Sequence, residues 1–168
     1  MGSSVYFYYV PYQYDIEAAL QSLRQREFLA GRYDPAMRQA NPPMWMFEFT
    51  FPPDASSPAP GPVHATLGDA FFNNEMGAEG TRSIIDLFQI TSEPDSCAAS
   101  PLAEDDLHAH FGTTKPCREQ IKTQLFSPNW TPAAERILTS IDRGQGRYIV
   151  LHENGAPSEI FFIGYSFD

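Results

Sequence analysis

Hydrophobic and polar positions at the start of the chain predict a strand followed by an amphipathic helix. Residues 4–10 are mostly β-branched or aromatic and stop at Pro11, as expected of a strand. Hydrophobic residues in the segment 16–30 then recur every three or four positions, the spacing that places them on one helix face. Asp15 can cap this helix at its start, and Gly31 can end it.

The pattern at the C-terminus predicts a β-hairpin. Residues 148–153 and 160–167 form two runs rich in β-branched and aromatic side chains. Asn154-Gly155 between them is a residue pair preferred in a tight type I′ turn. Pro157 lacks a backbone N–H group, so we expect a bulged or loose pairing just after the turn.

Two central segments also predict strands, and a proline-rich stretch follows the first of them. Aromatic residues alternate over 44–51, and aliphatic residues are concentrated in 82–90. Residues 52–63 are rich in proline, serine, alanine and glycine, which predicts an irregular surface loop rather than a domain linker. A short helix is expected near residues 66–75.

Three helices are predicted in the second half of the chain, in segments 100–111, 114–125 and 131–143. In the first and third segments a hydroxyl residue is followed by proline, which combines a side-chain cap with a residue suited to the first turn. All three segments carry hydrophobic residues at helical spacing, and a glycine follows the first and the third.

These elements predict a single α+β domain spanning residues 1–168, with a surface loop at about 52–63. Strands at both ends and helices clustered in the second half favour a mostly antiparallel sheet with helices packed on one side and a C-terminal β-hairpin. A chain of 168 residues with 42% hydrophobic residues is large enough to bury one core without disulfides or metals.

The charge is distributed unevenly, and it is the most informative feature for function. The formal net charge is -10, and residues 39–114 account for all of it because their only basic residue is Arg82. The eleven acidic residues of this central segment are Glu48, Asp54, Asp69, Glu75, Glu79, Asp86, Glu93, Asp95, Glu104, Asp105 and Asp106. Such a field repels nucleic acid and anionic membranes and attracts basic partners.

We therefore expect a small acidic binding protein that docks a basic protein partner. The most concrete form of this hypothesis is an immunity or inhibitor protein that covers the cationic cleft of a nuclease-like toxin. The carboxylates expected to contact the partner are Glu75, Glu79, Asp86, Glu93, Asp95, Glu104, Asp105 and Asp106. Neither nucleic acid nor a membrane is expected as a partner.

The alternative is a small enzyme, or a domain that binds an anion or another small molecule. Thr113, Thr114 and Lys115 place two hydroxyls and an ammonium group at an expected helix start, and Arg143 and Arg147 flank two glycines. A pocket near these residues would fit this alternative. The simpler interpretation is a Thr114 helix cap, and an ordinary turn before the last hairpin.

Metal binding is only weakly indicated, and no cofactor is expected. His108 and His110 follow three acidic residues, and imidazoles and carboxylates are ligands for zinc. On a regular helix, however, these two histidines point about 200° apart, so they cannot hold one ion together. No recognisable spacing supplies a third ligand.

The sequence predicts a cytoplasmic location. No hydrophobic run approaches the roughly 20 residues that span a bilayer, and residues 1–6 lack a signal-peptide pattern. The two cysteines, Cys97 and Cys117, are expected to be reduced thiols, and the alternative is a disulfide formed on a secretory route. No nucleophile elbow or cysteine–histidine signature accompanies them.

Overall fold

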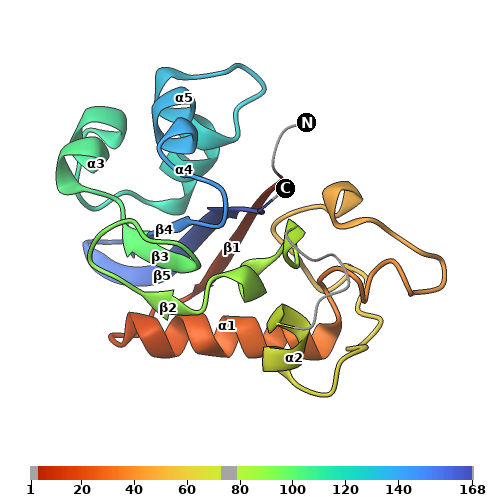
Figure 1. The fold of residues 1–168 in the computed structure, drawn as a ribbon. Coiled ribbons are helices and arrows are strands. Elements are labelled where there is room, and N and C mark those ends of the chain that lie inside the picture. The colour runs from red at the N-terminus through yellow and green to blue at the C-terminus, as the bar shows by residue number, and fades with distance from the viewer. Residues whose placement is uncertain (1–3, 73–78, 168) are drawn as a thin grey trace.

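A computed structural model describes residues 4–72 and 79–167, and its centre is a five-stranded mixed sheet (Figure 1). The predicted α+β class is confirmed. The strands are β1 (Val5–Pro11), β2 (Gln89–Ile90), β3 (Ala98–Pro101), β4 (Gly146–Glu153) and β5 (Ala156–Tyr165). The helices are α1 (Ile16–Ala30), α2 (Leu67–Phe72), α3 (Glu104–Phe111), α4 (Arg118–Leu125) and α5 (Pro132–Thr139). Among the described residues, no helix combines the length and the hydrophobicity of a membrane-spanning segment.

The strand order in the sheet is β1-β5-β4-β3-β2. Strand β5 pairs antiparallel with both β1 and β4, whereas β3 lies parallel to β4 and to β2. The three longest strands therefore form the antiparallel part that the sequence predicts. The two short strands add a parallel part that the sequence does not indicate.

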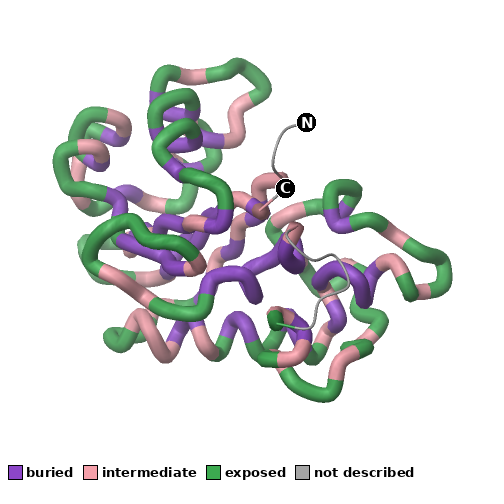
Figure 2. The backbone as a smooth tube through the Cα atoms, viewed as in Figure 1, coloured by how far each residue is buried: buried purple, intermediate pink, exposed green. Residues whose placement is uncertain are grey.

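Helices cover both faces of this sheet, and the buried backbone in Figure 2 follows the sheet between them. Helices α3, α4 and α5 pack on one face, against side chains such as Phe7 and Phe161, in agreement with the predicted helices on one side. Helix α1 also covers the opposite face, where Tyr6, Tyr8 and Leu20 are completely buried. The side chains of β1 contact these two faces in alternation, because successive side chains of a strand point in opposite directions.

The local signals at both ends of the chain are confirmed. Asp15 Oδ1 accepts a hydrogen bond from the Ala18 N–H group at 3.0 Å, which caps the start of α1. Gly31 follows that helix in the left-handed conformation, with φ 72°. In the C-terminal hairpin, Asn154 and Gly155 both have positive φ, as a type I′ turn requires. The β4–β5 register shifts close to this turn, as the nearby proline predicts.

The predicted strand at 44–51 is wrong. This segment contains the short 3₁₀ helix Met46–Glu48, and pairs of prolines bound it on both sides. Trp45 and Phe47 are exposed and stack on each other with ring centroids 5.8 Å apart, whereas Met46 is buried. The aromatic alternation resembles a strand, but prolines at both ends remove backbone donors that a strand ladder needs.

Only Gln89–Ile90 of the predicted strand at 82–90 joins the sheet. The first part turns instead, with φ 55° at Arg82, and a 3₁₀ helix follows. The Asp86 carboxylate fixes this turn by accepting hydrogen bonds from the backbone N–H groups of Thr81 and Arg82. A side chain that binds nearby backbone in this way competes with strand pairing.

The predicted start of α3 is wrong by a few residues. Ser100 and Pro101 end β3 rather than beginning the helix, which starts at Glu104. The Leu102 N–H group donates to the Tyr148 carbonyl oxygen at 3.1 Å and so extends the contact with β4. Pairing with a distant strand therefore overrides the local serine–proline signal.

Helix α4 begins at Arg118 instead of Thr114 for a similar reason. The Pro116 carbonyl oxygen accepts a hydrogen bond from the His152 N–H group at 2.9 Å, which holds the residues before α4 against the end of β4. The start of α5 is confirmed, because the Thr131 hydroxyl accepts a hydrogen bond from the third residue beyond it.

The outer edge of β1 is covered by an aromatic side chain. The Phe51 ring centroid lies 6.2 Å from that of Phe7 and 5.4 Å from that of Tyr8. Those two rings point to opposite faces of the sheet, so Phe51 lies at the strand edge that β5 does not occupy. The residues after it, 52–63, form only turns and bends. The contact of the Phe51 ring with β1 screens backbone groups that an edge strand otherwise exposes.

Candidate functional site

The central acidic residue Asp86 lies in the interior and does not face a partner. Its side chain is completely buried under α1 and accepts hydrogen bonds from the Thr81 and Arg82 N–H groups at 2.7 and 3.1 Å. Burial raises the pKa of the Asp86 carboxyl to about 7, and these hydrogen bonds oppose part of that rise. Asp86 therefore has a structural role in the 3₁₀ turn.

Ion pairs engage two further members of the predicted acidic set. The guanidinium of Arg82 lies 3.0 Å from Glu79 and 3.4 Å from the buried Asp34. Asp106 lies 3.3 Å from Arg136 of α5. These pairs reduce the charge that Glu79 and Asp106 present to a partner, and Glu75 lies outside the described residues.

The other four predicted carboxylates are exposed on either side of β3. They make no ion pair with any residue that the structure describes, and no basic residue occurs between positions 83 and 114. Figure 1 shows the β2–β3 loop and the start of α3 on the same side of the molecule, at the left of the view. We call this set the β3 acidic surface, and its members are Glu93, Asp95, Glu104 and Asp105.

Aromatic side chains lie beside one part of the β3 acidic surface. The Phe88 N–H group donates to the Cys97 carbonyl oxygen at 2.8 Å, so Phe88 sits at the base of the β2–β3 loop. Its ring is 36% exposed and meets the Phe71 ring edge-on at 5.1 Å. Phe72 completes the cluster and is 77% exposed. Sequence patterns did not identify this cluster, because its members come from two separate segments.

The residues of the predicted anion site are not brought together. Thr113 and Lys115 lie in the α3–α4 connection, next to the residue that contacts His152. Arg147 lies on β4 five residues before His152, and this separation corresponds to about 17 Å along a strand. Its buried guanidinium donates to the Ser140 and Gly146 carbonyl oxygens, and burial lowers its pKa.

The other two residues of that site do not change this result. Thr114 is half-buried in the same connection and precedes the start of α4 by several residues, so it is not the helix cap. Arg143 is exposed in the turn after α5. The enzyme or anion-binding alternative therefore stays a prediction.

The two candidate metal ligands are also separate. His108 is exposed and His110 is half-buried on α3. Within residues 4–72 and 79–167, no three histidine, cysteine, aspartate or glutamate side chains are grouped as a metal ion would require.

A cleft between the start of α4 and the β4–β5 turn contains both a thiol and an imidazole. Its volume is about 580 Å³, and Cys117, His152 and Glu159 line it. No hydrogen bond joins the thiol to the imidazole in the part of the chain that the structure describes. A nucleophile and its base work as a pair when they are within hydrogen-bonding reach, and no such contact is present between these two described side chains. Its members are far apart in sequence, and no motif indicated it.

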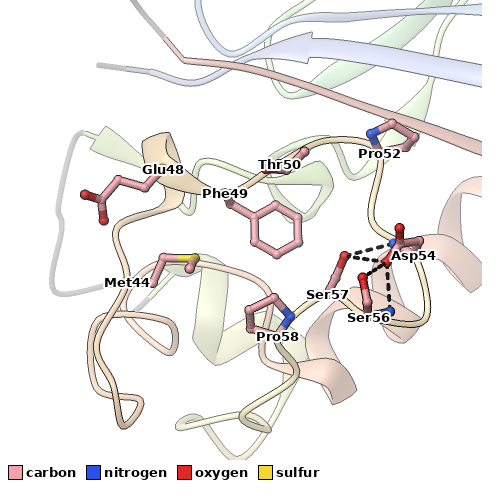
Figure 3. A pocket seen from close by; sticks show the side chains of 9 residues that line it. All are labelled: Met44, Glu48, Phe49, Thr50, Pro52, Asp54, Ser56, Ser57 and Pro58. Atoms are coloured by element: carbon pink, nitrogen blue, oxygen red, sulfur yellow. Dashed lines mark hydrogen bonds between the residues drawn. The ribbon is translucent and has the colours of Figure 1, made fainter.

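A smaller pocket of about 290 Å³ lies in the loop that follows the 3₁₀ helix at residues 46–48 (Figure 3). Met44, Phe49 and Pro58 form its apolar side. On the polar side, Asp54 accepts hydrogen bonds from the Ser56 N–H and hydroxyl groups at 2.8 and 2.6 Å. These hydrogen bonds lower the pKa of the Asp54 carboxyl and close a local turn. The polar groups of this pocket therefore stabilise the loop conformation.

Comparison with known proteins adds no relative: no family model, no curated protein and no solved structure matches the chain.

Proposed function

We propose that the protein binds a basic protein partner through the β3 acidic surface. The observation that carries this proposal is a group of four exposed carboxylates that form no ion pair with any described residue. They lie in a stretch of chain without lysine or arginine. Unpaired surface charges of one sign attract an oppositely charged partner over about 10 Å at moderate salt, and they speed its encounter. They also disfavour acidic partners.

The exposed aromatic cluster supplies the second part of the interface. Charged rims contribute mainly to encounter and selectivity, whereas buried aromatic side chains carry much of the binding energy. Phe72 and Phe88 are exposed; Phe88 lies at the base of the β2–β3 loop, and the Phe72 ring centroid lies 6.5 Å from that of Phe88. In the proposed complex they anchor the partner while the carboxylates surround its cationic groups.

The proposed partner is a protein with a cationic cleft, such as a nuclease-like toxin. Such a cleft is built to attract phosphates, so a row of carboxylates can occupy it in place of a nucleic acid. The protein then acts as an immunity or inhibitor protein. Its own acidic field keeps it from competing for nucleic acid.

Neutralising Glu93 and Asp95 together is expected to reduce capture of basic proteins by the immobilised protein roughly tenfold at low salt. The matched control neutralises Glu119 and Glu153, two exposed carboxylates that line the cleft between α4 and the β4–β5 turn and do not belong to the β3 acidic surface. The measurement is quantitative capture from the native lysate, followed by affinity measurements on the purified partner.

Raising the salt to about 1 M shortens the screening length to about 3 Å and is expected to release the partner. Loss of the partner's enzymatic activity on binding would identify an inhibitor. The proposal fails if no basic protein is retained at low salt, or if the Glu119 and Glu153 control reduces capture as much as the test variant.

A further inference from the structure

A groove between α4 and the outer edge of β1 has the composition of a small-molecule site. Its volume is about 550 Å³, within the roughly 300–1,000 Å³ of typical ligand pockets. β1 contributes one wall, α4 a second, and the segment around Phe51 a third. This groove is separate from the β3 acidic surface, which lies in the β2–β3 loop and at the start of α3, whereas β1 forms the opposite edge of the sheet.

Four half-buried aromatic side chains give the groove an apolar base. Phe7 and Phe126 stack with ring centroids 4.0 Å apart, and the Phe51 ring lies 6.2 Å from Phe7. Tyr9 follows on the same face of β1, with its ring 6.4 Å from that of Phe7. Because these rings pack on one another, the base is largely formed before a ligand arrives, and it fits a flat aromatic group.

Two cations from α4 line the same groove, and only one of them is already engaged. The Arg118 guanidinium lies 4.0 Å from the centre of the Tyr9 ring and 3.1 Å from Glu159. Lys122 is one turn further along the helix and therefore on the same side of it. Lys122 is exposed and forms no ion pair with the residues that the structure describes.

Tyr9, one of the residues that line the groove, carries a hydroxyl group without a partner among the described residues. The Tyr9 oxygen is buried and makes no hydrogen bond to any described residue. Burial raises the pKa of Tyr9 to about 12, so the hydroxyl keeps its proton at neutral pH and can donate it to an acceptor. A buried donor of this kind is stabilised by an acceptor such as a carboxylate oxygen.

We propose that this groove binds a small planar aromatic carboxylate. The aromatic ring lies against Phe7 and Phe126, and the carboxylate accepts hydrogen bonds from Lys122 and from the Tyr9 hydroxyl. The opposite rim carries the ionised Asp54, which disfavours ligands with a second negative charge. The combination selects a single carboxylate on a flat apolar body.

The test uses 2-naphthoate as the probe, with binding followed by its fluorescence at physiological salt. The neutral analogue 2-naphthylmethanol removes the charge, and acetate removes the ring. Naphthoate is expected to bind at least tenfold more tightly than either analogue. NMR shifts on binding are expected at Phe7, Phe51 and Phe126.

Two variants separate the contributions, and the chain supplies a matched control. Lys122→Gln is expected to weaken naphthoate binding roughly tenfold, as expected for the loss of one charge-assisted hydrogen bond, with no effect on naphthylmethanol. Tyr9→Phe keeps the ring and is expected to weaken naphthoate by a smaller factor. Lys115 is the only other lysine and lies outside the groove, so Lys115→Gln is expected to change nothing.

Three results would overturn the proposal. Naphthoate fails to bind at millimolar concentration, or the neutral analogue binds equally well, or Lys115→Gln weakens binding more than Lys122→Gln does. The last result would move the anion site to the α3–α4 connection. None of these results bears on capture of a basic protein by the β3 acidic surface.

Discussion

Gly31→Ala is expected to lower the free energy of unfolding by about 3 kcal/mol or more. Gly31 has a φ of 72°, and a Cβ atom there would lie 2.1 Å from the backbone carbonyl oxygen of Gly61. The substitution therefore destabilises the protein in two ways: it strains the backbone at residue 31, and its Cβ atom clashes with the main chain of Gly61. A main-chain atom cannot relieve a clash by changing rotamer, as a side chain can. The Gly61 N–H group also donates to the Ala30 carbonyl oxygen, so moving Gly61 would break a hydrogen bond.

Gly112→Ala is the control for this experiment. Gly112 ends α3 with a φ of 71°, but apart from its two chain neighbours no described residue has an atom within 4 Å of the Cβ position. This substitution is expected to cost only the left-handed conformation, about 1–2 kcal/mol. Urea unfolding followed by circular dichroism measures both variants. Equal losses at the two positions would show that the contact with Gly61 is not tight.

The second large effect concerns pH and the buried carboxyl of Asp86. Its pKa is about 7 in the folded protein and 3.8 without the fold. Between these values the folded state holds a proton that the unfolded state has lost, so stability falls as the pH rises from about 4 to about 7. Above pH 7 both states are ionised and the loss is complete. A difference of about three pKa units corresponds to roughly 4 kcal/mol over the whole range.

Asp86→Asn is expected to remove this slope, because the amide does not titrate. The measurement is the free energy of unfolding at several pH values from 4.5 to 8, about the range of the transition. Asp95→Asn is the control, because Asp95 is exposed and this substitution makes the same chemical change at the protein surface. Stability curves that stay parallel for the wild type and Asp86→Asn would contradict the assignment.

The sequence predicts those elements whose signals are local. Asp15, Gly31 and the Asn154-Gly155 turn each act within a few residues of their own position, and all of them are confirmed. The serine–proline pair at 100–101 carries an equally clear helix-start signal, yet it ends a strand. There the deciding contact is with Tyr148, far along the chain, and no local pattern contains that information.

The same limit applies to the sites. The sequence shows that the central segment is acidic, but it does not show which of its carboxylates reach the surface. Asp86 is buried in the fold, whereas Asp95 is exposed. The aromatic groove assembles Phe7, Phe51 and Phe126 from three distant segments, and no periodicity links them. The sequence therefore gives the chemical character of the site residues, whereas which of these side chains lie together, and which are exposed, depends on the fold.

The position of Phe51 beside β1 has a consequence for self-association. A bare outermost strand invites copies of the same chain to stack edge to edge and grow into fibrils. At this edge a second copy of the chain meets the Phe51 ring before it reaches the backbone groups of β1, which disfavours such stacking. Concentrated samples should therefore resist fibril growth through the β1 edge.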